Sequence, residues 1–357
     1  MSEAPVLVAV RNRIGHLTLN RPAGLNALNL EMVGLLQRQL AAWADDPQIH
    51  AVVLRGAGEK AFCAGGDIRA LYDSYRAGDG QWQRFFAEEY ALDQYIHAYR
   101  KPILALLDGF VLGGGLGLAQ GAALRVVTER SRMGMPETAI GYFPDVGASH
   151  FLPRLPGALG NYLGLTGVQI RAADALHAGL ADWCLPSEQL AELDRCLDNL
   201  SWTVHPQEAL RTLLATLATR KPAGGELAAL QPAIDLHFAQ PGVAAIRASL
   251  LAERREEFRA WAQATVQTLD ARSPLALCVT LELLRRGREL PLAECFALEL
   301  HLDRQWFEHG DILEGVRALI VDKDKQPRWN PPSLAAVDPA RVAAFFAAPA
   351  ERSRQAG

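Results

Sequence analysis

The chain has 357 residues, of which 50% are hydrophobic and 21% charged, a composition typical of a globular protein with a sizeable core. Its formal net charge of -4 argues against nucleic acid or an anionic membrane as the main partner. The five cysteines are scattered and include no C-x-x-C pair, so neither a zinc site nor a disulfide framework is expected.

The N-terminal residues MSEAPVLVAVRNR have no positively charged segment ahead of their short apolar run, unlike a signal peptide. The most apolar uncharged run, residues 109–124, is glycine-rich and shorter than a bilayer span. An odd number of cysteines in a large chain suits a reducing compartment. We therefore expect a cytoplasmic protein.

The hydrophobic pattern changes period along the first half of the chain. Residues 6–10 and 17–19 read as a strand hairpin, and Met32, Leu36, Leu40 and Trp43 recur at helical spacing. The apolar runs 51–54, 102–107 and 125–127 are of strand length, and residues 68–100 have a helical pattern. Strand, glycine turn and helix repeat in this order, which predicts an α/β fold of repeated ββα units.

Long alanine- and leucine-rich helical patterns, such as 243–263 and 274–290, take over from about residue 190. We therefore predict an α/β core with the active site in residues 1–190 and a C-terminal helical region in 191–350.

Two glycine stretches follow predicted strands, at residues 63–67 (CAGGD) and 113–115 (GGG). Glycines at a strand-to-helix junction leave backbone N–H groups free to stabilise an oxygen that gains negative charge. Tight helix–sheet packing also favours glycine. Neither stretch has the G-x-G-x-x-G pattern of a dinucleotide site.

The segment 135–145 (MPETAIGYFPD) carries two acids, Glu137 and Asp145, among mostly apolar residues. Burial raises the pKa of a carboxyl group toward the range useful for acid–base catalysis. Each acid also follows a proline, so both could instead cap short helices or turns.

Together these stretches resemble the crotonase, or enoyl-CoA hydratase/isomerase, superfamily. The resemblance is carried by FCAGGDI (62–68), GFVLGGGLGL (109–118) and MPETAIGYFPDVG (135–147). It extends to NRPAGLNALN (20–29), FFAEEY (85–90) and HGDILEGVRALIVDKDKQPRWNPP (309–332). The resemblance implies a spiral of repeated ββα units, and the chain looks most like the branch that hydrolyses acyl-CoA thioesters.

The resemblance assigns roles by position. Gly66 and Gly114 match the two residues whose N–H groups form the oxyanion hole for the thioester oxygen. Glu137 matches the acid of the M-P-E-T-A-I-G motif, Asp145 the second acid of the hydrolase branch, and Glu89 a substrate-contacting acid. An acyl-CoA substrate, no cofactor, no metal and a possible homo-oligomer are also implied.

One departure separates the branches of the superfamily. Hydratases that resemble this chain carry a glutamate at the position of Gly117. Adding water to a C=C bond uses two carboxylates, so the lack of this glutamate, together with the extra acid at Asp145, favours hydrolysis over hydration. The resemblance then implies hydrolysis of a short 3-hydroxyacyl-CoA, above all 3-hydroxyisobutyryl-CoA of valine degradation. The alternatives are an enoyl-CoA hydratase or isomerase in which Asp145 replaces that glutamate, and a non-catalytic acyl-CoA binder.

Overall fold

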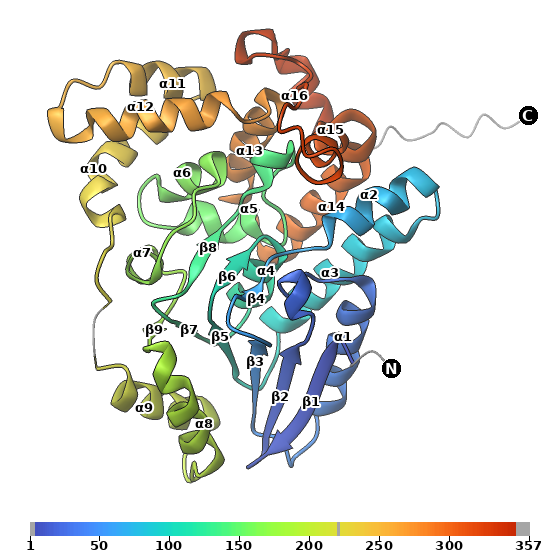
Figure 1. Cartoon of the computed structure of the whole chain (residues 1–357), viewed down its shortest axis with the longest axis vertical. Helices are drawn as coiled ribbons and strands as arrows, with labels where there is room; N and C mark the ends of the chain where they lie inside the picture. Colours follow the sequence, from blue (N-terminus) through green and yellow to red (C-terminus); the bar gives the residue numbers. More distant parts are fainter. Residues whose placement is uncertain (1–3, 220–221, 348–357) are drawn as a thin grey trace, which may run out of the picture.

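A sheet of six strands, in the order β1-β2-β3-β5-β7-β9, forms the centre of the computed structural model, which describes residues 4–219 and 222–347 (Figure 1). Strands β1 (Val6–Arg11) and β2 (Ile14–Leu19) pair antiparallel, which confirms the predicted hairpin. Asn12 and Arg13 in its turn have φ angles of 43° and 62°, as a two-residue type I′ turn requires. The other neighbouring strands of the sheet are parallel.

The predicted ββα repeat is confirmed. Its members are β3 (Ala51–Gly56), β4 (Ala61–Cys63), α2 (Ile68–Ala77) and α3 (Gln81–His97); β5 (Ile103–Leu107), β6 (Phe110–Leu112) and α4 (Gly114–Gln120); and β7 (Leu124–Val127), β8 (Arg132–Gly134) and the 3-10 turn η2 (Glu137–Ile140). The first strand of each unit joins the large sheet, and the second strands form a small parallel sheet, β4-β6-β8. Because parallel strands end at one edge, the three turns that follow β4, β6 and β8 lie together.

Helix α1 (Leu30–Ala44) begins where Asn29 accepts a hydrogen bond of 2.9 Å from the backbone N–H of Met32. Strand β9 is Trp183–Cys184. The remaining helices are α5 (Ala148–Phe151), α6 (Leu159–Thr166), α7 (Ala172–Ala178), α8 (Leu190–Asp198), α9 (Pro206–Leu217), α10 (Leu227–Phe238), α11 (Val243–Leu251), α12 (Glu256–Asp270), α13 (Pro274–Gly287), α14 (Leu292–His309), α15 (Ile312–Val316) and α16 (Pro339–Phe345). Short turns are η1 (Pro22–Gly24), η3 (Leu152–Arg154), η4 (Ser187–Gln189), η6 (Leu334–Ala336) and the π-helical η5 (Arg317–Val321).

Two segments with one continuous helical pattern fold as two helices each. Residues 68–100 are interrupted between α2 and α3, where Gly78, with a φ angle of 67°, ends α2 and Gly80, with a φ angle of 73°, precedes α3. Residues 243–263 are interrupted between α11 and α12. There Glu253 turns inward, and its Oε2 atom lies 2.8 Å from Nε2 of His237. In both places a local contact outweighs the helical periodicity.

Helices cover the large sheet and extend above it (Figure 1). Leu193 and Leu197 of α8 and Leu210 and Leu214 of α9 pack with one set of sheet residues, which includes Val53. Helix α14 packs on α3, which brings the C-terminal region against the α/β core. The division into 1–190 and 191–350 stays a prediction. None of the helices in the described ranges is long and apolar enough to cross a membrane.

Candidate active site

The two glycine turns lie against each other at the edge of the small sheet. A Cβ atom on Gly65, where φ is 96°, would lie 3.1 Å from the carbonyl oxygen of Leu112 and 3.5 Å from the nitrogen of Gly114. Neither Gly66 nor Gly114 donates its backbone N–H to a hydrogen bond within the described part of the chain. Two adjoining turns thus provide two unpaired donors, one of them at the start of α4.

Glu137 and Glu89 both lie beside the second glycine turn. Glu89 precedes this turn in the sequence, and Glu137 follows it. The Oε1 atom of Glu137 lies 2.7 Å from the position of a Cβ on Gly113, and a Cβ on Gly114 would collide with Oε1 of Glu89. Both carboxyl groups are buried, and each has one oxygen without a hydrogen-bond partner. Burial raises both pKa values well above the usual range, and neighbouring acids add to the effect.

Asp145 lies in the loop that follows η2 and is also buried. The hydroxyl of Tyr90 donates a hydrogen bond of 2.7 Å to its Oδ2 atom. Burial raises the pKa of Asp145 to about 7, while the Tyr90 hydrogen bond acts in the opposite direction. The group therefore changes charge near neutral pH, which suits an acid or base in catalysis.

All five residues singled out in the sequence line one cavity of about 150 Å³: Gly66, Glu89, Gly114, Glu137 and Asp145. The rest of its wall is mainly apolar, with Phe85, Phe86 and Ile140 among the contributors. A space of this size accommodates a small acyl group but not a long fatty acyl chain. The structure thus brings together every predicted site residue, and their chemical roles stay predictions.

The space beside Gly117 is already filled. A Cβ atom at this position would lie 2.7 Å from Oδ2 of Asp93 and 2.7 Å from Cβ of Val146. Val146 has a φ of 51°, a left-handed conformation that is strained for a β-branched residue. There is no room for the glutamate found here in hydratases, and the carboxyl group that comes nearest belongs to α3.

Sequence reasoning missed three further buried acids that lie near Glu89 and Asp145, namely Asp93, Glu299 and Asp303. Glu89 and Asp93 are four residues apart on α3, and Glu299 and Asp303 are four residues apart on α14, which packs on α3. This i, i+4 spacing of acids among aromatic residues was the available signal, because it places both on one helix face.

These acids differ in their partners. Glu299 accepts hydrogen bonds from the N–H of Gly147 (2.7 Å) and from the N–H and hydroxyl of Ser149, and burial raises its pKa to about 8. Asp303 accepts the hydroxyl hydrogen of Tyr142, and its pKa is raised by burial. Neither carboxyl oxygen of Asp93 has a partner, and burial raises its pKa as well. So many carboxyl groups in one buried region favour protonated forms at neutral pH.

Within residues 4–219 and 222–347, no three His, Cys, Asp or Glu side chains are arranged to hold a metal ion. The predicted lack of a metal and of a cofactor stays a prediction.

Repeated ββα units with two adjoining glycine turns over a pocket of buried acids define the crotonase class of protein. The chain belongs to the enoyl-CoA hydratase/isomerase family, whose sequence profile matches residues 14–346. The mitochondrial 3-hydroxyisobutyryl-CoA hydrolase of Xenopus tropicalis is 40% identical over 336 residues, which cover 93% of this chain and 86% of the relative.

Two solved structures are similar over nearly the whole chain. A carnitinyl-CoA dehydratase from Mycobacterium thermoresistibile has a TM-score of 0.89 and 37% identity, covering 98% of each chain. An enoyl-CoA hydratase from Rhodobacter sphaeroides has a TM-score of 0.85 and 39% identity, covering 96% of this chain and 97% of the other.

The predicted cytoplasmic location is wrong, because the similar hydrolase is a mitochondrial protein. That prediction depended on scattered cysteines and on an N-terminus unlike a signal peptide. Neither feature distinguishes the cytoplasm from another reducing compartment.

Replacing Gly117 with alanine tests the filled space beside α4. We expect the free energy of unfolding to fall by about 1–3 kcal/mol, since the new methyl group overlaps Val146 and Asp93. The control is Gly34→Ala in α1, where the methyl group meets only the end of the Arg38 side chain. We expect this variant to be at least as stable as wild type, because alanine has a higher helix propensity than glycine. Chemical denaturation measures both; a Gly117→Ala protein as stable as wild type contradicts the packing.

Replacing Asp93 with asparagine tests the buried charge. A carboxyl group whose pKa is raised in the folded state binds protons more tightly there than in the unfolded chain. Its stabilising effect is therefore fully present below its ordinary pKa near 3.8 and is lost as pH rises toward the folded value.

We expect the stability of the Asp93→Asn protein relative to wild type to rise as the pH increases from about 4 to 8, by on the order of 1 kcal/mol or more. The control is Asp73→Asn, which removes an exposed i, i+4 ion pair with Arg69 and changes stability little at either pH. Parallel stability–pH curves for Asp93→Asn and wild type would rule out a buried titrating group.

Proposed function

We propose that this chain hydrolyses 3-hydroxyisobutyryl-CoA, or a close short 3-hydroxyacyl-CoA, to the free hydroxy acid and CoA, as in valine degradation. The similarity to the Xenopus hydrolase over 93% of the chain supports this choice. The observation that carries it at the site is the pairing of Glu137 and Asp145 with a filled space at Gly117.

The thioester carbonyl would lie between the N–H groups of Gly66 and Gly114. These two unpaired donors stabilise the oxygen as it gains negative charge when the carbonyl is attacked. Their position on a rigid sheet edge means that no reorganisation is needed during the reaction. This activation requires neither a metal nor a cofactor.

Glu137 acts in one of two ways, which the residues leave open. As a general base, its carboxylate takes a proton from water, the oxygen of that water attacks the carbonyl carbon, and the C–S bond breaks. As a nucleophile, its oxygen attacks the carbonyl carbon and displaces the thiolate, and water then hydrolyses the mixed anhydride. Both routes consume one water and release one acid and one thiol.

Asp145 would orient the 3-hydroxyl group or deliver the proton that the leaving thiolate gains. Its pKa of about 7 allows both protonation states under ordinary conditions. Glu89, which lies against Gly114, would contact the substrate from the opposite wall.

Hydration of an enoyl-CoA is the second candidate, because one of the two similar solved structures is a carnitinyl-CoA dehydratase and the other is an enoyl-CoA hydratase. In that case Asp145 would provide the second carboxylate. Loss of the absorbance of a conjugated enoyl-CoA without release of thiol distinguishes hydration from hydrolysis. The homo-oligomer and the lack of nucleic-acid or membrane partners stay predictions. Light scattering measures the oligomeric state.

Replacing Glu137 with glutamine tests the proposed reaction. We expect thiol release from 3-hydroxyisobutyryl-CoA to fall at least about a hundredfold, because the amide is neither a base nor a nucleophile. Glu88→Gln, on the outer side of α3 and paired with Arg84, is the matched control and retains activity. Thiol release by Glu137→Gln at the wild-type rate would disprove the assignment.

Replacing Tyr90 with phenylalanine tests the ionisation of Asp145. The Tyr90 hydrogen bond lowers the pKa of Asp145, so its loss raises that pKa further above the ordinary value. We expect the inflection of kcat/KM near pH 7 to move upward, by up to about one unit.

The control for this experiment is Tyr99→Phe, because the Tyr99 hydroxyl donates to the backbone carbonyl of Leu40 on α1. Its pH profile stays that of wild type. If the Tyr90→Phe profile also overlays wild type, Asp145 is not the titrating group.

A further inference from the structure

One face of helix α14 is bonded to the segment that carries Asp145. Glu299, Asp303 and Trp306 lie at positions i, i+4 and i+7 of α14, a spacing that places all three on the same side of a helix. All three side chains are buried. Their partners belong to residues 141–149, which we call the site loop. These two parts of the chain are 150 to 165 residues apart in the sequence.

Glu299 holds the part of the site loop that follows Asp145. One carboxyl oxygen accepts the backbone N–H of Gly147 at 2.7 Å, and the other accepts the backbone N–H of Ser149 at 2.9 Å and its hydroxyl hydrogen at 2.5 Å. Three donors of the loop thus depend on one buried carboxyl group. Buried donors that lose their acceptor are costly, so these bonds fix the course of the chain just after Asp145.

Asp303 and Trp306 hold the part of the site loop that precedes Asp145. The carboxyl of Asp303 accepts the hydroxyl hydrogen of Tyr142. One turn further along α14, the indole N–H of Trp306 donates to the backbone carbonyl of Gly141 at 2.8 Å. The site loop is therefore bonded to α14 both before and after Asp145.

The backbone between these contacts is strained. Val146 has a φ angle of 51°, and a β-branched residue keeps such a conformation only where its surroundings impose it. The neighbouring carboxyl of Asp145 has a direct contact with α3, the 2.7 Å hydrogen bond from Tyr90. Its position thus depends on two helices, on α3 through a direct bond and on α14 through the loop.

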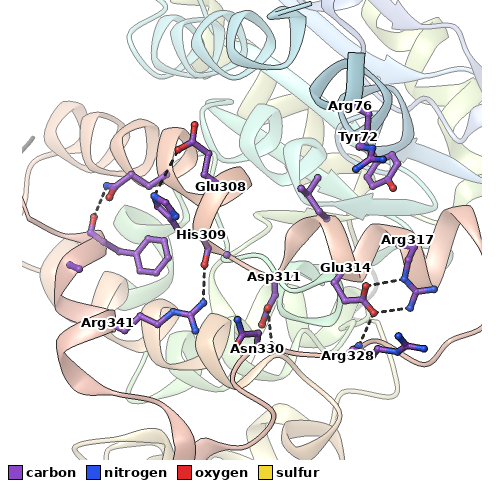
Figure 2. Close-up of a pocket in the computed structure, with 15 residues that line it drawn as sticks. Tyr72, Arg76, Glu308, His309, Asp311, Glu314, Arg317, Arg328, Asn330 and Arg341 are labelled. Carbon is purple, nitrogen blue, oxygen red and sulfur yellow. Dashed lines mark hydrogen bonds and ion pairs between the residues drawn. The ribbon is translucent and has the colours of Figure 1, made fainter. Parts of the chain in front are cut away.

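Helix α14 is itself anchored at its C-terminal end (Figure 2). The guanidinium of Arg341 donates to the carbonyl of His309, the last residue of α14, at 2.9 Å. Just beyond the helix, Asp311 accepts the backbone N–H of Asn330 at 3.1 Å and the hydroxyl hydrogen of Ser273 at 2.5 Å. These contacts make α14 a fixed support for the site loop.

We propose that Glu299 and Asp303 are positioning residues, which act through the site loop to hold the carboxyl of Asp145 at the reacting thioester. This proposal rests on the proposed function, in which Asp145 orients the 3-hydroxyl group or protonates the leaving thiolate. In the described part of the chain neither Glu299 nor Asp303 lines the cavity, so both act through other residues. A displacement of about 1 Å at a reacting group can lower the rate as much as about a hundredfold.

The ionisation of Asp145 reports on this support. The titratable groups around it are Glu89, Tyr90 and Asp93 of α3, Glu137 of η2, Tyr142 of the site loop, and Glu299 and Asp303 of α14. Burial is the main cause that raises the pKa of Asp145 to about 7. A loosened loop lets water reach the carboxylate, so the pKa falls toward its ordinary value. The expected direction is opposite to that of Tyr90→Phe.

Two substitutions of Asp303 separate its hydrogen bond from its charge. Leucine has a comparable size and no acceptor, whereas asparagine keeps an oxygen that accepts the Tyr142 hydroxyl hydrogen. For Asp303→Leu we expect kcat with 3-hydroxyisobutyryl-CoA to fall at least about tenfold and KM to stay within about twofold. The inflection of kcat/KM near pH 7 moves downward by about half a unit or more. Asp303→Asn stays close to wild type in all three.

Carbon-13 NMR of protein labelled at the aspartate carboxyl carbons follows the same ionisation without substrate. The resonance that disappears in Asp145→Asn identifies Asp145. We expect its pKa to be lower in Asp303→Leu than in wild type and unchanged in Asp303→Asn. The control is Glu294→Leu on the exposed side of α14, which keeps the wild-type kinetics and titration.

Milder variants test the same support if Asp303→Leu does not fold. Tyr142→Phe removes only the hydroxyl that Asp303 accepts, and Glu299→Gln keeps one of the two oxygens that hold the loop. We expect each to lower the pKa of Asp145 in the NMR titration and to reduce kcat by on the order of threefold.

The outcomes separate this proposal from the proposed function. A wild-type titration of Asp145 in Asp303→Leu, or in both milder variants, would overturn the positioning role. Equal shifts in Asp303→Leu and Asp303→Asn would overturn it as well, because they would assign the effect to charge. Failure of the wild-type protein to release thiol would instead overturn the proposed function, and the NMR titration would still decide whether α14 positions Asp145.

Discussion

The close packing of α3 on the glycine-rich turn and first residues of α4 is the constraint on which the site depends. Gly114 and Gly117 have ordinary helical backbones, so glycine is needed there for room and not for conformational freedom. A Cβ atom on either would meet a carboxyl group of α3, Glu89 in one case and Asp93 in the other. Only a helix without side chains on this face lets acids lie beside a free backbone N–H.

This arrangement has an electrostatic cost. Buried carboxyl groups lose hydration, and close neighbours of the same sign cannot all be ionised. Tyr90 and Tyr142 each donate a hydroxyl hydrogen to one of the acids, Asp145 and Asp303, and Glu299 receives donors from the start of α5. Asp93 receives none. The region is therefore organised for proton chemistry at some expense of stability, as is common at active sites.

The sequence allowed the local parts of this structure to be predicted, and fewer of the long-range ones. The hairpin, the ββα repeat and the five cavity residues depend on short motifs at the ends of neighbouring strands. Asp93, Glu299 and Asp303 were missed because their environment is created by contact between α3 and α14, about two hundred residues apart in the chain. Helical periodicity also could not show the interruption at Gly78, since the pattern resumes in α3.

The packing of α14 on α3 also bears on how the protein matures. During synthesis, all five cavity residues leave the ribosome long before α14, the helix that packs on α3. Contacts between segments so far apart in sequence form slowly, and domains of this size commonly populate partly folded states. A nascent chain that ends before α14 would therefore lack the helix that packs on α3, and with it Glu299 and Asp303. The full set of buried acids is assembled only when the C-terminal region has folded onto the core.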